Sequence, residues 1–252
     1  MLQSIIEFTG LTSFELLITT GAVFLAGLVR GFAGFALSAI LMSSVVFILP
    51  PVELIPLCFV LEAAASLFML RGGMKSADMS VVWVLAIGSA IGVPIGLYAT
   101  VSISPEISKL VALIIIMTLT FAQLFNFAPR ALGTKAGLYA SGLIAGIVTG
   151  LASVGGMVVA LYVLSSKAHP ETMRSSLVMF LFLGMFTSLI YMLLYGVLDY
   201  QAMQRGMVFT PIVLTGVYSG SRLFRLSFVK YYKQFCLLLL ITLSFVGMLK
   251  MI

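Results

Sequence analysis

The sequence contains one pattern of glycine, alanine and proline twice. Residues Gly27–Ala33 read GLVRGFA, and 119 residues later Gly146–Ala152 read GIVTGLA. Pro51 and Pro170 are a further equivalent pair with the same offset. Two later pairs have an offset of 124 residues: Gly92 and Gly216, and Gly96 and Gly220. A polar loop lies between the two registers, where a small insertion is tolerated best. In a membrane protein, such duplication is typical of transporters built from internal repeats.

The composition indicates an integral membrane protein. Hydrophobic residues make up 62% of the 252 residues and charged residues only 9%, whereas soluble domains carry about 25% charged residues. Because so few polar groups cannot cover a globular surface, most of the outside must face lipid. At about 20 residues per spanning helix, we expect about eight to ten membrane segments. The first apolar run begins near Phe14 and is interpreted as a retained helix rather than a signal peptide.

The net charge of +6 does not indicate a partner such as nucleic acid. Basic residues stand singly or in small groups between apolar runs, as topology signals do. One cluster, formed by Arg222, Arg225, Lys230 and Lys233, is suited to fixing the orientation of the chain against anionic lipid.

The apolar runs predict an all-α integral membrane protein with about five hydrophobic segments in each half. We divide the chain into a first membrane repeat, 1–132, and a second, 133–252, which together form a single integral membrane domain. Segments in the first half are expected near 14–30, 33–49, 54–70, 79–100 and 109–126. Those in the second half are expected near 137–151, 155–165, 172–196, 206–223 and 234–250.

The number of segments in each half decides how the halves are oriented. If 14–49 is one bent helix, each half has four spans, the repeats are parallel, and Lys and Arg are divided almost evenly between the two sides. If 14–30 and 33–49 are separate legs, the number is odd and the second half is inverted. Most basic residues then gather on one side: Arg71, Lys75, Arg130, Lys135, Lys167, Arg174, Arg222, Arg225, Lys230 and Lys233. The positive-inside rule therefore favours two inverted repeats with both termini outside.

The paired segments that open each half are expected to be short or broken helices. The runs 137–151 and 155–165 are too short to cross about 30 Å of hydrocarbon comfortably. A re-entrant hairpin has the same parity as two short spanning legs, so the sequence leaves both forms open.

The breaks between the paired segments are the best candidates for a substrate site. Glycine lets the backbone leave helical geometry and lets a ligand approach closely. A helix that begins after a break directs unsatisfied N–H groups into the gap, which suits an anion. The residues assigned to the site from these breaks are Gly31, Phe32, Gly34, Ser38, Gly150, Ser153, Gly155 and Gly156. The alternative role for any single glycine is close packing between helices.

These glycines resemble the stretch of the type G-x-x-x-G-x-x-G-x-G-G that opens each repeat of the TauE/SafE family of sulfite and sulfonate permeases. The second copy carries four of its glycines and the first copy three: Gly146, Gly150, Gly155 and Gly156, and Gly27, Gly31 and Gly34. Ser175-Ser176 and Gly220-Ser221-Arg222 resemble two further family motifs, whereas Met42 and Tyr162 lie near positions where the family often has proline. The resemblance implies transport of sulfite, sulfonates, sulfoacetate or similar anions, coupled to protons, in the bacterial cytoplasmic (inner) membrane.

Three charged residues are candidates for the chemistry of the site. Arg30 lies beside the first break, where an intramembrane arginine faces a cavity or a partner, or else snorkels to the interface. Arg174 with Ser175 offers a guanidinium fork and a hydroxyl that suit a sulfonate, or else is a positive-inside anchor. Glu62 lies well inside an apolar run. We therefore expect it to carry the coupling proton or to pair with an arginine, with a structural hydrogen bond as the alternative.

An enzymatic function is not expected. His169 is the single histidine, Cys58 and Cys236 lie far apart, and no nucleotide-binding motif occurs, so we expect no metal and no cofactor. The expected function is alternating-access transport around a midplane site, and the alternatives are a non-transporting scaffold or an anion channel. The expected partners are a small anionic substrate, the lipid bilayer and protons, and a homodimer is left open.

Overall fold

The computed structural model is a bundle of helices, and it describes residues 2–125, 127, 130–165, 169–224, 238 and 241. The elements of these residues are α1 (Leu2–Thr9), α2 (Ser13–Ala33), α3 (Leu37–Val45), α4 (Pro51–Ser76), α5 (Met79–Ser102), α6 (Pro105–Leu124), the 3₁₀ helix η1 (Arg130–Gly133), α7 (Lys135–Ala152), α8 (Gly155–Ser165), α9 (Pro170–Leu194) and α10 (Tyr200–Phe224). No strand occurs among them. The predicted all-α fold class is confirmed.

Local capping decides where the helices begin. Thr12 caps α2 in a reciprocal capping box with Glu15, and Asp78 caps α5, which satisfies amides that have no partner within the helix. Pro51 and Pro170 occupy the first turns of α4 and α9, where the missing N–H of proline costs nothing. Most helices therefore begin within four residues of the predicted segments, and α8 coincides with its segment, whereas α10 begins at Tyr200 rather than near position 206.

Among the described helices, six are long and apolar enough to cross a membrane, namely α2, α4, α5, α6, α7 and α9. The chain is therefore a multi-pass membrane protein. Helix α10 has 25 residues but carries Gln201, Gln204 and Arg205 in its first two turns, which makes it more polar. The described residues thus contain fewer clear spans than the eight to ten expected. The following predicted features lie outside the described residues: Lys167, Arg225, Lys230, Lys233, and segment 234–250 apart from positions 238 and 241.

Each half opens with a hairpin of one long and one short helix. Helices α3 and α8 have 9 and 11 residues, or about 14 and 17 Å at 1.5 Å per residue, so neither can cross a bilayer. Helices α2 and α7 have 21 and 18 residues and can cross. The expectation of two short legs was therefore wrong for the first leg, because α7 extends beyond its apolar run to the N-cap Thr134.

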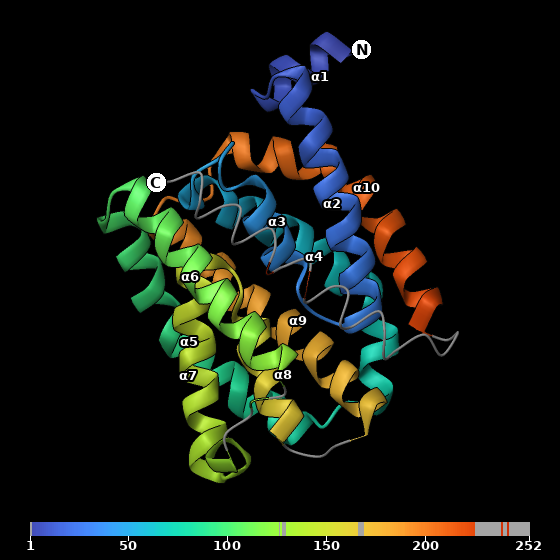
Figure 1. Cartoon of the computed structure of the whole chain (residues 1–252), viewed down its shortest axis with the longest axis vertical. Helices are drawn as coiled ribbons and strands as arrows, with labels where there is room; N and C mark the ends of the chain where they lie inside the picture. The colour runs from blue at the N-terminus through green and yellow to red at the C-terminus, as the bar shows by residue number, and fades with distance from the viewer. Residues whose placement is uncertain are drawn as a thin grey trace.

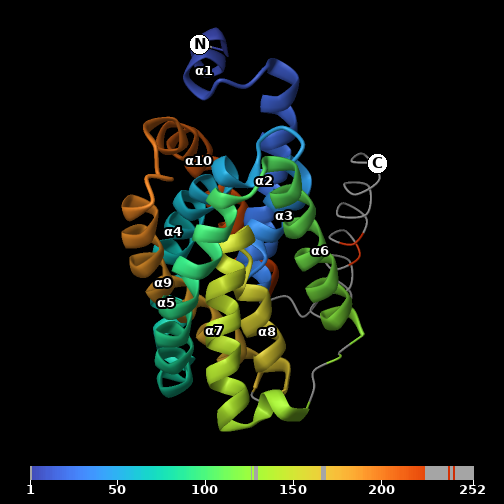
Figure 2. The same cartoon turned by 90° about the vertical axis from the view of Figure 1, so that its left-hand side faces the viewer.

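The two hairpins enter the molecule from opposite ends. In Figures 1 and 2, α2 begins at the upper end, where the N-terminus lies, and α3 turns back toward that end. Helix α7 begins at the lower end, and α8 turns back toward the lower end. We use "upper end" and "lower end" in this sense below. The tips of both hairpins lie in the middle of the bundle.

Two glycine-lined seams hold the bundle together: α2 packs on α10, and α5 packs on α7. A Cβ at Gly27 would meet the backbone of Val213, and a Cβ at Gly146 would meet the backbone of Ser89 in the same way. Three further contacts of the first seam have counterparts in the second at the two sequence offsets: Gly31–Val217 and Gly150–Val93, Gly216–Phe24 and Gly92–Leu143, and Gly220–Leu28 and Gly96–Ile147. Small residues let the backbones touch and form rigid pairs, and each pair joins the two halves.

Helices α4 and α9 lie between the seams. Helix α4 packs on α10, α9 packs on α5, and the two also contact each other. The middle of α4 therefore faces the tips of both hairpins, and this arrangement positions the candidate site.

Candidate functional site

Each hairpin tip contains a residue in the left-handed backbone region, and the two residues are 119 positions apart. Gly34 in the first break has a φ of 85°, and Ser153 in the second has a φ of 59°. Glycine adopts such a φ without strain, whereas a non-glycine residue rarely does. Ala36, with a φ of 74°, completes the first turn. These conformations end α2 and α7 and let α3 and α8 begin at the centre.

The two breaks meet at a narrow cleft that we call the junction. The hydroxyl oxygens of Ser38 and Ser153 are 3.5 Å apart. Ala36, Glu62 and Gly156 line the same cleft, whose volume is about 10 Å³. The first turns of α3 and α8 thus face one point in space. Sequence reasoning predicted the two breaks separately, and the structure brings them into contact.

A buried ion pair lies beside the junction. The Nε of Arg30 donates to an Oε2 of Glu62 at 2.8 Å, one Nη donates to Ser66 at 3.0 Å, and the other donates to the carbonyl of Gly34. The second carboxylate oxygen of Glu62 accepts a hydrogen bond from Ser38 at 3.2 Å. The side chain of Arg30 therefore does not reach the membrane interface. In this structure Arg30 and Glu62 pair with each other.

The charges of the site are balanced but unequally exposed. The side chain of Arg30 is 0% exposed and that of Glu62 is 15% exposed, so the carboxylate is the partner that an incoming ligand reaches. A buried pair of this kind persists only when further hydrogen bonds satisfy both groups, as Ser66 and Ser38 do. The first turns of α3 and α8 add partial positive charge from unsatisfied amides. The helix starts and Arg30 thus contribute positive charge at the junction, and in this structure the carboxylate of Glu62 is the negative group that balances it.

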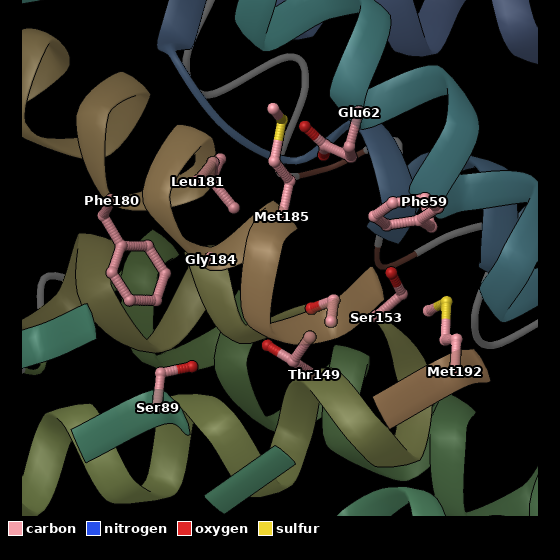
Figure 3. A pocket seen from close by; sticks show the side chains of 11 residues that line it. Phe59, Glu62, Ser89, Thr149, Ser153, Phe180, Leu181, Gly184, Met185 and Met192 are labelled. Atoms are coloured by element: carbon pink, nitrogen blue, oxygen red, sulfur yellow. The ribbon is translucent and has the colours of Figure 1, made fainter. Parts of the chain in front are cut away.

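Next to the junction lies a cavity of about 50 Å³, which we call the Glu62 pocket. Figure 3 shows Glu62 and Phe59 of α4 on one side, with Thr149 of α7 and Ser153 of the second break facing them and Met185 of α9 beside Glu62. The remaining lining residues come from α5 and α9: Ser89, Phe180, Leu181, Gly184, Ser188 and Met192. The pocket is mostly apolar, with hydroxyls and one carboxylate as its polar groups.

Arg174 lies away from this pocket and binds the end of α2. Its guanidinium donates to the carbonyls of Gly31 and Phe32 and to the hydroxyl of Ser221 at 3.4 Å. A cation at a helix C-terminus satisfies the last carbonyls and the negative end of the dipole. At the end of α7, the hydroxyl of Thr100 satisfies one of the last carbonyls by donating to the carbonyl of Gly150 at 2.9 Å.

Two of the predicted site glycines are packing positions. A Cβ at Gly31 would overlap the carbonyl of Val217, and a Cβ at Gly150 would overlap the backbone of α5 at Val93. Both residues belong to the seams described above. For Gly31 and Gly150, the alternative of close helix packing is what the structure displays.

The other predicted residues differ in their access to the junction. Gly155 packs tightly on the backbone of α7, whereas a Cβ at Gly156 would find ordinary contacts, the nearest 3.4 Å away at Leu181. Gly156 lines the junction. Phe32 and Ser175 are buried and line neither the junction nor the Glu62 pocket.

Sequence reasoning missed several residues that surround the charged pair. Ser66 lies four residues after Glu62, on the same face of α4, and this spacing was a usable signal. Thr149 is the equivalent of Arg30 at the 119-residue offset, so the repeat itself could have identified it. For Ser89 and Ser188 no sequence signal existed, because serines in apolar runs more often bond to their own helix.

Comparison with known proteins supports the assignment made from these motifs. The chain matches the family Sulfite exporter TauE/SafE over residues 19–247. Searches of the curated proteins and of the solved structures found no match. The matched range covers most of the chain and includes both breaks, the ion pair and both seams. This multi-pass membrane protein therefore belongs to the TauE/SafE sulfite exporter family.

Proposed function

We propose that this protein is a secondary transporter that exports small sulfur-containing anions, with sulfite as the first candidate, by alternating access around the junction. The observation that carries the proposal is the convergence of two helix starts and Glu62 on one small cleft, with Arg30 paired to Glu62. The family match to a sulfite exporter points to the same class of substrate. Sulfonates and sulfoacetate carry a related anionic group and belong to the same proposal. The membrane that we propose is the bacterial inner membrane.

The proposed anion site has three sources of attraction. The guanidinium of Arg30 offers N–H donors in a fixed fork, the first turns of α3 and α8 begin at the junction and have amides without partners in their own helices, and Ser38 and Ser153 offer hydroxyl donors. The junction itself has a volume of only about 10 Å³, but the adjoining Glu62 pocket of about 50 Å³ holds a few atoms of the size of a water oxygen, since one water needs about 10–15 Å³. This volume favours a compact ion such as sulfite over a longer organic sulfonate in the present state.

We further propose that Glu62 links the anion to a proton. An anion that binds Arg30 must displace the carboxylate, because Glu62 occupies the Nε of Arg30 in this state. A carboxylate that loses its cation in apolar surroundings is more stable when it is protonated. Anion and proton would therefore bind together, and the Arg30–Glu62 pair would re-form when both leave.

We also propose that residues 1–132 and 133–252 are inverted repeats. In support, the seam contacts recur at equivalent positions, and α2 and α7, which are equivalent, begin at opposite ends in Figure 1. The lower end carries basic residues near the end of α4 and the start of α7, among them Arg71, Lys75 and Lys135. By the positive-inside rule the lower end would face the cytoplasm.

The test is sulfite flux in proteoliposomes that contain the purified chain. The unmodified protein should move sulfite and should do so faster when a pH gradient is imposed. Glu62→Gln should keep sulfite binding but lose at least about 90% of the acceleration, because it mimics the protonated acid and cannot exchange a proton. Glu106→Gln is the matched control, since Glu106 is exposed at the start of α6, and its response should be unchanged.

Each outcome has a distinct meaning for the proposal. An unchanged gradient response in Glu62→Gln would leave Glu62 with a structural role and place coupling elsewhere. Electrical conductance with no response to pH in either protein would identify an anion channel. The absence of any flux from correctly inserted protein would favour a scaffold.

A further inference from the structure

The equivalence of α4 and α9 allows the two ends of the molecule to be compared position by position. The two helices begin at Pro51 and Pro170, which are 119 residues apart. At this offset Gly73 of α4 corresponds to Met192 of α9, and Phe59 of α4 corresponds to Val178 of α9. Helix α4 begins at the upper end and α9 at the lower end (Figure 1).

At the lower end the equivalent helices touch. A Cβ placed on Gly73 would lie 2.9 Å from Cγ1 of Val178, 3.3 Å from its Cβ and 3.4 Å from Sδ of Met179. Gly73, Val178 and Met179 are all buried. The last third of α4 and the first third of α9 therefore close against each other without a gap.

The equivalent pair at the upper end, Phe59 and Met192, borders a cavity. Phe59 and Met192 both line the Glu62 pocket rather than closing it. The same two surfaces are thus in contact at one end of the molecule and line a cavity at the other.

The outer contacts of the two helices show the opposite asymmetry. At the upper end, α4 is held on α10: Glu53 pairs with Arg205 at 2.7 Å, and a Cβ at Gly206 would lie 2.7 Å from the Cβ of Val60. Arg205 also donates to the carbonyl of Thr9 at 2.7 Å. Helix α4 therefore lies firmly against the seam at the end where it lines a cavity with α9.

The counterparts of Glu53 and Arg205 are Thr172 and Val81, at offsets of 119 and 124. Together with Asp78 and Ser176 they line a cavity of about 230 Å³ at the lower end. The hydroxyl of Ser80 donates to Asp78 and lowers the pKa of this carboxyl, which therefore stays charged at the mouth of the cavity. A cavity thus lies between α9 and the start of α5 at the end where α9 closes on α4, beside a hydrogen bond of 3.0 Å from the backbone N–H of Asp78 to the hydroxyl of Ser176.

We propose that α4 and α9 are the two gates of the transport cycle and that this structure is the state in which the Glu62 pocket opens toward the upper end. In the alternate state, Phe59 and Met192 meet, the contact of Gly73 with Val178 opens, the Glu53–Arg205 pair separates, and the cavity beside Thr172 closes. A methionine suits the upper gate because its flexible side chain fills irregular gaps. The inference rests on the proposed function, since gates require a transport cycle.

Two disulfide pairs test the gates directly, in a background where Cys58 and Cys236 are replaced by alanine. Gly73→Cys/Val178→Cys should lock the state described here, because the two Cβ positions are close enough for a disulfide and loss of the Val178 methyls makes room. Phe59→Cys/Met192→Cys should lock the alternate state. Oxidation of either pair should reduce sulfite flux at least ten-fold, and a reductant should restore it. The four single variants are the controls, and oxidation should not change whatever flux each of them has in the reduced form.

A third cysteine at Ser188, in the wall of the Glu62 pocket, reports which state is locked without any need for substrate. A membrane-impermeant thiol reagent applied from the upper end should label it at least ten-fold faster in the Gly73–Val178 lock than in the Phe59–Met192 lock. Equal labelling in both locks, or failure of the Phe59–Met192 pair to oxidise in active protein, overturns the gates. If the protein moves no sulfite but position 188 is still labelled at least ten-fold faster in the Gly73–Val178 lock, the gates are supported and only the proposed substrate is overturned.

Discussion

At the scale of single residues, the polarity of the centre is carried by the first half of the chain. The 119-residue counterparts of Arg30, Glu62 and Ser66 are Thr149, Leu181 and Met185, and these three line the Glu62 pocket. Arg30 therefore fills its own half, whereas its shorter counterpart Thr149 and the apolar Leu181 and Met185 border the cavity in the other half. A binding space beside a charged pair is the direct result of this unequal divergence.

The ion pair should be energetically coupled. Removing one partner leaves a buried charge uncompensated, so Arg30→Ala and Glu62→Ala should each lower the free energy of unfolding by about 3–5 kcal/mol. The double variant should cost less than the sum, because it leaves neither charge alone. Thermal unfolding of all four proteins in detergent measures the coupling. Costs that add within about 0.5 kcal/mol would mean that the two residues are independent.

At the scale of helices, the seams are the rigid elements and the hairpin tips and central helices are the adaptable ones. In the seams, glycine is required because another backbone occupies the place of the side chain, as Ile147 does at Gly96. By contrast, a Cβ at Gly72 of α4 would meet nothing within 4 Å. The same residue type therefore has different tolerance according to the neighbouring helix.

Replacing Gly96 and Gly72 by alanine should distinguish the effect of close helix packing on stability from the effect of intrinsic helix propensity. Gly96→Ala should lower the stability of the protein by about 1–3 kcal/mol, since the added methyl group overpacks the α5–α7 seam. Gly72→Ala should be neutral or stabilising by up to about 1 kcal/mol, because alanine is the better helix former. Melting temperatures in detergent provide the comparison. Equal shifts for both variants would remove the packing role assigned to the seam.

At the scale of the whole molecule, the two seams exchange helices between the halves. Helix α2 of the first half packs on α10 of the second, and α7 of the second packs on α5 of the first. Neither half can therefore bury its glycine face without the other. This exchange places α4 and α9 in equivalent positions at the centre, which is the geometry that two alternating gates need.

The inverted arrangement predicts the sidedness of two exposed positions. Lys75 lies in the last turn of α4 and Tyr200 follows the end of α9, and both residues are exposed, so the variants Lys75→Cys and Tyr200→Cys report on the two ends. In the background without native cysteines, an impermeant thiol reagent should reach position 200 from outside the cell and position 75 only after the membrane is opened. Labelling of both from the same side would exclude inversion.

Much of this architecture was predictable because the responsible forces are local. The apolar runs, the caps and Pro51 and Pro170 predict where helices begin, since burial in lipid and unsatisfied amides act on short stretches of chain. The glycine pattern identified both breaks and the family, and the cost of an intramembrane charge singled out Glu62 and Arg30.

The tertiary structure decided which role each of these residues has. Arg30 and Glu62 are 32 residues apart, and only the crossing of α2 with α4 brings them together. Arg174 caps α2 rather than joining the pocket, because the start of α9 packs beside Gly31 and Phe32. Whether a glycine serves packing or the site depends on what lies opposite it, as Gly150 and Gly156 show. Sequence by itself determined the segments and the candidates, since both depend on local chemistry, whereas the pairing of distant side chains is a property of helix crossings alone.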